Sequence, residues 1–314
     1  MEMFMNYLGT LPGVVIQGLV WGVMAVGLYI TFKILDVADM TVDGSICLGG
    51  AVCAVMVTSG VNIYVAMICA LLAGMCAGLM TGILHTFFGI PAILAGILTQ
   101  ISLWSVNLLI MKGSANVSIS RFKFGDKLLL QMSSDRRFIN IGILVLFSVV
   151  IITLLYTFLA TRTGAALRAT GNNLDMSRAQ GINTDLTTVL GLVISNGIVA
   201  LAGSLLAQYS NAADINMGKG AIVTGLAAIT IGEALCARFN TPYVVKQGCV
   251  IIGSIIYWLV YQTVIFLGLP SMYMKALAAI VVILFLGVPH IKRKYFAKKK
   301  KPHVAVIEGG AENA

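Results

Sequence analysis

Polar side chains recur within the apolar segments of this chain, where each polar group needs a partner. Gln100 and Asn107 lie about two helical turns apart in one apolar run, and Ser195 and Asn196 lie at the middle of another. Because an uncharged amide or hydroxyl is costly in lipid, each is expected to face a neighbouring helix or a water-filled path. For any one of them an interhelical hydrogen bond is the commoner role. As a set they suit a path for a polar solute without strong charge.

A second polar cluster separates two apolar runs near the N-terminus. Three aspartates, Asp36, Asp39 and Asp43, precede Ser45 within ten residues. Asp43 or Ser45 could cap the helix that follows, and the aspartates could simply be solvated. Alternatively, a polar break beside a short apolar run indicates a discontinuous helix next to a pathway, for which Asp39 and Asp43 are candidates. The sequence alone leaves these alternatives open.

The chain lacks the motifs of common catalytic and nucleotide sites. It has no G-x-x-x-x-G-K-[ST], G-x-S-x-G or H-E-x-x-H, so it cannot hydrolyse ATP by the P-loop route, and no enzyme activity is expected. Glu233 is the only acidic residue inside the apolar runs, which argues against a proton- or sodium-coupled carrier. The three histidines are far apart and the six cysteines form no CxxC pair. We therefore expect no metal site and no cofactor, and cysteines that pack as small apolar residues without disulfides.

The loop over residues 161–186 is polar and carries signals for a short helix. Asn172 or Asn173 can cap that helix, with Asp175 in its first turn and Gly181 at its end. Apolar contacts and positive charge come from Leu174, Met176, Ala179, Ile182, Arg168 and Arg178. A short, capped, amphipathic helix between two membrane spans is suited to docking in a groove of a partner protein. The alternative is an interfacial helix that lies on lipid.

The elements that must position these residues are membrane helices. The chain is 59% hydrophobic and only 11% charged, less than half the charge of a typical soluble domain, which excludes a soluble enzyme or a disordered chain. Two short runs, Ser45 to Thr58 and Ala221 to Ala237, could be half-helices or re-entrant segments. We expect an all-α polytopic membrane protein with eight or nine transmembrane or partly crossing helices. Seven runs meet or approach the roughly 20 residues that a span needs: Leu11 to Ile34, Ile63 to Phe88, Pro91 to Met111, Phe138 to Ala160, Leu186 to Gln208, Tyr243 to Leu267 and Met272 to Pro289.

Basic residues predict the orientation of the chain. Seven of the 21 Lys and Arg residues lie between Lys292 and Lys301, directly after the last apolar run. This pattern is typical of a cytoplasmic anchor against anionic lipid, and it lacks the interleaved aromatics of a nucleic-acid site. We expect one transmembrane domain over residues 1–289 and a cytoplasmic tail over 290–314. Alternating back through nine spans places residues 161–185 inside, and residues 112–137 and the N-terminus outside.

Small residues also recur at helical spacing. Gly74, Gly78 and Gly82 form a G-x-x-x-G-x-x-x-G stripe, which allows two helix backbones to approach closely. We expect this stripe to pack inside one bundle, with a contact between two copies of the chain as the alternative.

At the 161–186 loop the sequence resembles a known family. The segment TRTGAALRATGNNLDMSRAQGIN, the later Ser195-Asn196-Gly197, and the run from DINMG to GLAAI are similar to the permease subunits of ABC importers of the branched-chain amino acid and ribose type. The segment ILDVADMTVDGSICLGGAV looks most like one branch, uncharacterised permeases encoded with a substrate-binding lipoprotein and an ATPase, some of them proposed to import aromatic amino acids. The resemblance covers Val14 to Val288.

The resemblance implies a role and partners. It implies a cell-membrane permease for a small polar organic solute, with an amino acid as one candidate. The permease would work with a separate ATP-binding subunit, an extracytoplasmic substrate-binding protein and a second permease, either a copy or a paralogue. The family's coupling helix maps onto Asn173, Leu174, Asp175, Met176, Arg178, Ala179, Gly181 and Ile182. A stand-alone carrier or channel is the alternative.

Overall fold

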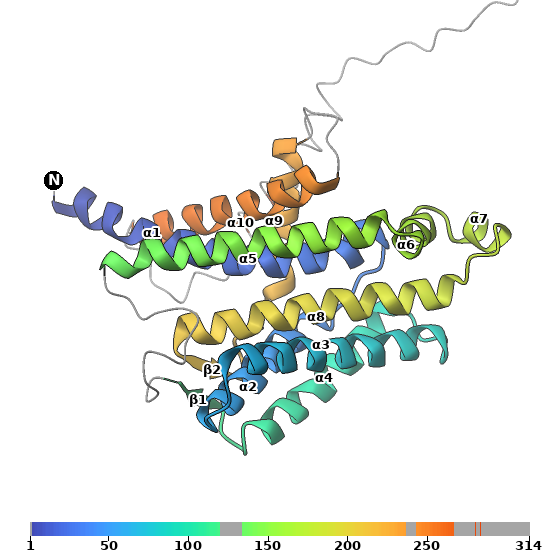
Figure 1. The fold of residues 1–314 in the computed structure, drawn as a ribbon, viewed down its shortest axis with the longest axis horizontal. Helices are drawn as coiled ribbons and strands as arrows, with labels where there is room; N and C mark the ends of the chain where they lie inside the picture. The colour runs from blue at the N-terminus through green and yellow to red at the C-terminus, as the bar shows by residue number, and fades with distance from the viewer. Residues whose placement is uncertain (1, 120–133, 237–242, 267–279, 281–282, 284–314) are drawn as a thin grey trace, which may run out of the picture.

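The protein is a bundle of long apolar helices. The computed structural model describes residues 2–119, 134–236 and 243–266, together with residues 280 and 283. Among the described residues, six helical segments are long and apolar enough to cross a membrane, and the prediction of an all-α polytopic protein is confirmed. The seventh long run, Met272 to Pro289, lies almost wholly outside the described residues, as does the tail. The elements that carry the six segments are α1 (Glu2–Tyr29) with the π-helical turn η1 (Ile30–Ile34), α3 (Ile63–Thr86), α4 (Ala92–Ile110), α5 (Ser134–Ala160), α8 (Thr184–Ser210) and α10 (Tyr243–Phe266) (Figure 1).

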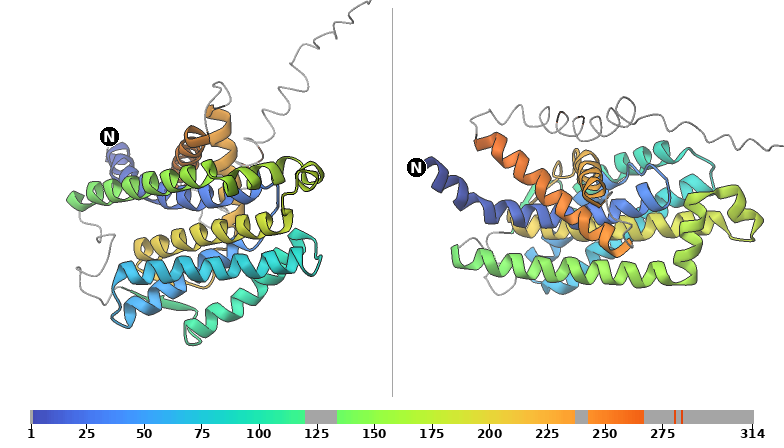
Figure 2. Two further views of the ribbon diagram at one scale, coloured as in Figure 1. Left: turned by 45° about the vertical axis from the view of Figure 1, so that its right-hand side comes forward. Right: turned by 90° about the horizontal axis from the view of Figure 1, so that it is seen from above.

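Among the described residues, two shorter apolar helices coincide with the two short runs of the sequence. They are α2 (Val42–Thr58) and α9 (Ala221–Cys236). Both follow irregular segments, residues 35–41 and 215–220. Figures 1 and 2 show that α9 runs across the direction of the long helices, whereas α2 lies among them.

The bundle has two distinct ends. At one end lie the short helices α6 (Arg162–Asn172) and α7 (Leu174–Ala179). At the opposite end, next to α2 and the end of α8, the strands β1 (Asn116–Ser118) and β2 (Ala212–Asp214) form an antiparallel pair in which Val117 is opposite Ala213 (Figure 1). The described start of the 112–137 loop and the 161–185 loop therefore lie at opposite ends of the molecule.

The small-residue stripe of α3 packs inside the bundle. A side chain at Gly74 would collide with Asn196 and Ala200, and one at Gly78 would collide with the carbonyl group of Leu192. These neighbours all lie on α8, so α3 and α8 are in close backbone contact. The expected packing within one bundle is confirmed.

The expectation for the cysteines was wrong for one pair. Cys236 and Cys249 form a disulfide that joins the end of α9 to α10, with their Cα atoms 6.5 Å apart. A spacing of 13 residues gives no signal of pairing, and only the packing of α9 against α10 brings the two thiols together. Cys47 and Cys53 are buried as expected, and neither takes part in a disulfide.

Candidate functional site: a buried polar segment, a cavity and a docking loop

The first two helices of the bundle run in opposite directions. Near the end of α8, Tyr209 donates to Gly13 on α1 and Gln208 lies beside Cys53 on α2, whereas the middle of α8 meets the end of α1 and the start of α2. Residues 35–41 are therefore a reversal between two helices, and the alternative of one discontinuous helix is not what the structure has.

A buried hydrogen-bonded chain lies in this 35–41 segment. The Asp39 carboxylate is 4% exposed, and it accepts hydrogen bonds from the Thr41 backbone N–H (2.8 Å) and from Asn196 Nδ2 (2.6 Å). Ser45 Oγ donates to Asn196 Oδ1 over 2.6 Å. The middle of α8 is thereby tied to the 35–41 segment and to the start of α2.

Ser195 joins a different pair of helices. Its hydroxyl donates to the carbonyl oxygen of Gly27 on α1 over 2.8 Å and lies 3.5 Å from Thr31 Oγ1. Ser195 and Asn196 are completely buried. Their polar groups therefore make interhelical contacts, as do those of Asp39.

Capping of α2 by Asp43 or Ser45, one of the alternatives that the sequence left open, is not what the structure has. The residue before α2 is Thr41, whose side chain makes no capping hydrogen bond. The Asp43 carboxylate instead accepts hydrogen bonds from the backbone N–H groups of Gly220 and Ile222, each over 3.0 Å. These donors belong to the first turn of α9 and the residue before it, where backbone N–H groups lack helical partners and carry partial positive charge. The reason is tertiary: α2 and α9 begin side by side, so a carboxylate on one satisfies the other.

A cavity of about 400 Å³ lies beside this meeting point. It is bounded by α2, α4 and the turn before α9. Of the predicted pathway residues, Asp43, Gln100 and Asn107 line it together, while Asp39, Ser195 and Asn196 do not. The full lining is Asp43, Gly44, Cys47, Ile97, Gln100, Ile101, Trp104, Ser105, Asn107, Ile215 and Lys219.

The cavity includes two residues that sequence reasoning did not single out. Lys219 stands between two glycines in the turn before α9, and Trp104 lies on α4 one turn beyond Gln100. Lys219 is exposed, and it is the cationic residue among those that line the cavity. A lysine flanked by glycines beside an apolar run is the local signal that could have marked it.

The predicted short helix of the loop is present as α7. Asn173 caps it by accepting a hydrogen bond from the Met176 backbone N–H over 2.9 Å, and Asp175 lies in its first turn. Gly181 follows with φ +78°, a left-handed conformation that favours glycine. Leu174 and Met176 are 51% and 63% exposed, so α7 presents apolar surface at the end of the molecule.

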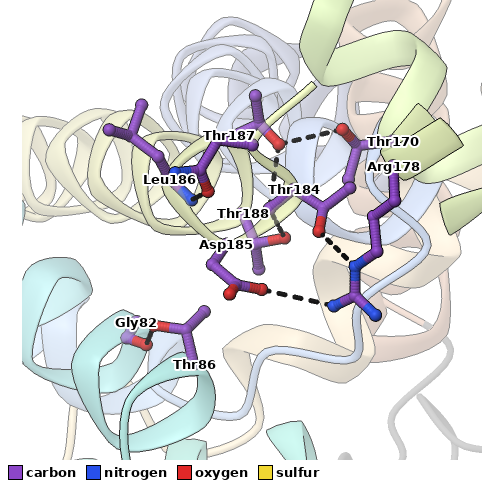
Figure 3. A network of polar contacts seen from close by, with 10 residues as sticks. Gly82, Thr86, Thr170, Arg178, Thr184, Asp185, Leu186, Thr187 and Thr188 are labelled. Carbon is purple, nitrogen blue, oxygen red and sulfur yellow. Dashed lines mark hydrogen bonds and ion pairs between the residues drawn. The ribbon is translucent and has the colours of Figure 1, made fainter. Parts of the chain in front are cut away.

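Side-chain contacts fasten α6 and α7 to the start of α8 (Figure 3). Arg178 Nε donates to Thr184 Oγ1 over 2.9 Å, and its guanidinium pairs with Asp185 at 3.4 Å. The hydroxyls of Thr170 and Thr187 lie 2.8 Å apart and join α6 to α8. A displacement of α7 would therefore reach the first turns of α8.

A polar cavity of about 460 Å³ lies at the same end of the bundle. Its lining includes Lys33 and Arg168, from the η1 turn and from α6. Lys33 Nζ also pairs with the Glu233 carboxylate at 3.0 Å. This ion pair links η1 to α9. Glu233, the one acidic residue expected inside the apolar runs, is therefore paired with a lysine near the end of α9.

Comparison with known proteins gives a consistent picture. Residues 11–286 match the family described as the branched-chain amino acid transport system permease component. The chain is 39% identical, over 274 residues, to a tyrosine transport system permease protein of Clostridioides difficile, covering 87% of this chain and 89% of that protein. It is 34% identical to an uncharacterised protein of Rickettsia prowazekii, covering 88% and 96% of the two chains. It is also 28% identical to the inner membrane ABC transporter permease protein YjfF of Escherichia coli, covering 68% and 64%. No solved structure matches the chain.

Proposed function

Because this chain belongs to the family of branched-chain amino acid transport system permease components, we propose that it forms the membrane pathway for a small solute of the amino-acid class. It is the permease subunit of an ABC importer in a cell membrane. The relative named for tyrosine transport supports an amino acid as the solute. The cavity supports it as well, because groups of both charges and apolar side chains line one space. The match of residues 11–286 to this family is the single observation that carries the proposed function.

The proposed topology has nine crossings. Six are the long apolar helices, and the run from Met272 to Pro289 would be a seventh. Each of the remaining two crossings would consist of a short helix, α2 or α9, together with the irregular segment that precedes it. The end that carries α6 and α7 is cytoplasmic in this arrangement, as is the tail over residues 290–314, which would bind anionic lipid through its lysines.

The proposed coupling element is Asn173 to Ile182, which docks on a separate ATP-binding subunit. Leu174 and Met176 support this role because they expose apolar surface, and Arg178 holds α7 to the start of α8 through its hydrogen bond to Thr184. Asn173 and Gly181 define the two ends of α7. Motion imposed on α7 would pass to α8 and from there, through Asn196, to Asp39 in the 35–41 segment.

The partners follow from this role. They are the ATP-binding subunit, an extracytoplasmic substrate-binding protein and a second permease, which in the simplest assembly is another copy of this chain. A stand-alone carrier or channel is the competing function. It is less well supported because the chain exposes a docking helix and has few ionisable groups in its apolar runs.

Reconstitution tests the proposal. The permease, its co-purifying ATP-binding subunit and the binding protein would be placed in liposomes with a mixture of the twenty amino acids. We expect uptake of at least one amino acid that requires ATP and all three proteins. Uptake by the permease alone, without ATP, would establish the carrier instead.

A further inference from the structure

The lining of the cavity between α2 and α4 includes a buried side-chain amide, that of Asn107, whose oxygen accepts no hydrogen bond from the described residues. Asn107 is 1% exposed, and its Nδ2 lies 3.5 Å from the carbonyl oxygen of Gly44, to which it donates. This contact orients the amide and leaves Oδ1 without a hydrogen-bond partner among the described residues. A buried acceptor without a donor is costly, so this atom indicates that a donor occupies the cavity at some stage of transport.

The charged groups of the cavity have opposite signs and come from different elements. Asp43 lies on α2, and its carboxylate is fixed in place by the backbone of Gly220 and Ile222. Lys219 lies on the adjoining turn and lines the same space. A carboxylate has further lone pairs after two hydrogen bonds, so Asp43 can accept another from a ligand.

The rest of the lining is largely apolar. Ile97, Ile101 and Trp104 come from one face of α4. The volume of about 400 Å³ falls in the range of small-molecule sites. A site with one anion, one cation, a free amide acceptor and an apolar wall matches a molecule that has an ammonium group, a carboxylate and an apolar side chain.

We propose that this cavity binds a zwitterionic α-amino acid with an apolar or aromatic side chain during its passage through the permease. The ammonium group of the solute donates to Asn107 Oδ1 and the Asp43 carboxylate. Its carboxylate pairs with the Lys219 ammonium, and its side chain lies against Trp104. This assignment rests on the proposed function and adds the place in the permease where the solute binds and the residues that contact it.

The same geometry excludes related molecules. An amine without a carboxylate would leave Lys219 unpaired, and a carboxylic acid without an ammonium group would leave Asn107 Oδ1 without a donor. Loss of one charge-assisted hydrogen bond weakens binding by roughly tenfold or more. Recognition at this site therefore depends on both head groups at once.

Direct binding tests the proposal without the binding protein. The purified complex of this permease and its ATP-binding subunit would be placed in lipid nanodiscs, with binding of radiolabelled phenylalanine and leucine measured by scintillation proximity. We expect saturable binding that unlabelled phenylalanine displaces. Phenethylamine and 3-phenylpropanoate, which each lack one head group, should compete at least about tenfold more weakly.

Two substitutions assign the site. Lys219→Met, at an exposed position, and Asn107→Leu should each weaken binding by about tenfold or more. Lys112→Met is the matched control, because Lys112 is an exposed lysine at the same end of the bundle that does not line the cavity, and it should bind as the unmodified protein does. Lys219→Met keeps the test valid if Asn107→Leu does not fold.

The outcomes are separable. If the complete importer drives ATP-dependent amino acid uptake but neither probe binds, or if binding is unchanged in Lys219→Met, the cavity assignment is overturned and the proposed function stands. If the complete importer drives no uptake, the proposed function itself fails.

Discussion

The side-chain amide of Asn196, at the middle of α8, donates to the buried carboxylate of Asp39 over 2.6 Å. Asp39 lies in the irregular segment between η1 and α2, and Asn196 also accepts a hydrogen bond from Ser45. The segment between η1 and α2 is therefore held by α8, whose first turns are bonded to α7 through Arg178 and Thr184. One helix thus connects the proposed docking element to the centre of the bundle.

Removal of this connection should destabilise the protein. Asn196→Ala leaves the Asp39 carboxylate and the Ser45 hydroxyl buried without their partner, at an expected cost of about 3 kcal/mol in the free energy of unfolding. The measurement is thermal unfolding in detergent. Ser204→Ala is the control, because the buried Ser204 hydroxyl donates to the Leu201 carbonyl oxygen of its own helix and, within the described part of the chain, to no other helix. Equal losses in the two variants would contradict the role given to Asn196.

Asp43 of α2 should cap the N-terminus of α9. Asp43→Ala removes the acceptor for two N–H groups at the start of α9, and we expect a loss of about 1 to 2 kcal/mol in stability. Asp43→Asn keeps one oxygen acceptor and should lose less. Thermal unfolding of both variants gives the comparison, and a larger loss in Asp43→Asn than in Asp43→Ala would refute the capping role.

The contact between α3 and α8 should not tolerate a methyl group. Gly78→Ala places a Cβ against the Leu192 carbonyl group, so we expect a lower melting temperature, equivalent to about 1 to 3 kcal/mol. Gly142→Ala is the matched control in α5, where no described atom outside its own helix backbone and its two chain neighbours lies within 4 Å of the added Cβ. That variant should be neutral or slightly more stable, because alanine favours helix. Size-exclusion profiles and melting curves of the two variants decide the matter.

Reversal of charge at the docking element should uncouple transport. Arg178→Glu replaces the guanidinium that holds Thr184 and Asp185 with a carboxylate that repels Asp185. We expect ATP-driven uptake to fall by at least about tenfold while the permease remains folded and monodisperse. Arg162→Glu changes the same charge at an exposed position in the first turn of α6 and should retain uptake. Normal uptake by Arg178→Glu would remove this arginine from the coupling proposal.

The sequence by itself determined the features that depend on local physics. Long apolar runs predicted all six of the described long helices, because the length and hydropathy of a span are properties of a single segment. The order Asn173, Asp175 and Gly181 predicted a short capped helix, because an N-cap and a left-handed glycine act within a few residues. The spacing of Gly74, Gly78 and Gly82 likewise predicted a close helix contact within the bundle.

Only the tertiary structure decided which distant groups meet. Asp43 caps α9 rather than its own helix because two short helices begin side by side, and the 177 residues that separate Asp43 from Gly220 leave no local signal. The Cys236–Cys249 disulfide and the presence of Lys219 and Asn107 in the lining of one cavity have the same cause. Hydropathy specifies that a segment is buried in the membrane, whereas the partner of each polar atom is specified by packing between segments far apart in the chain.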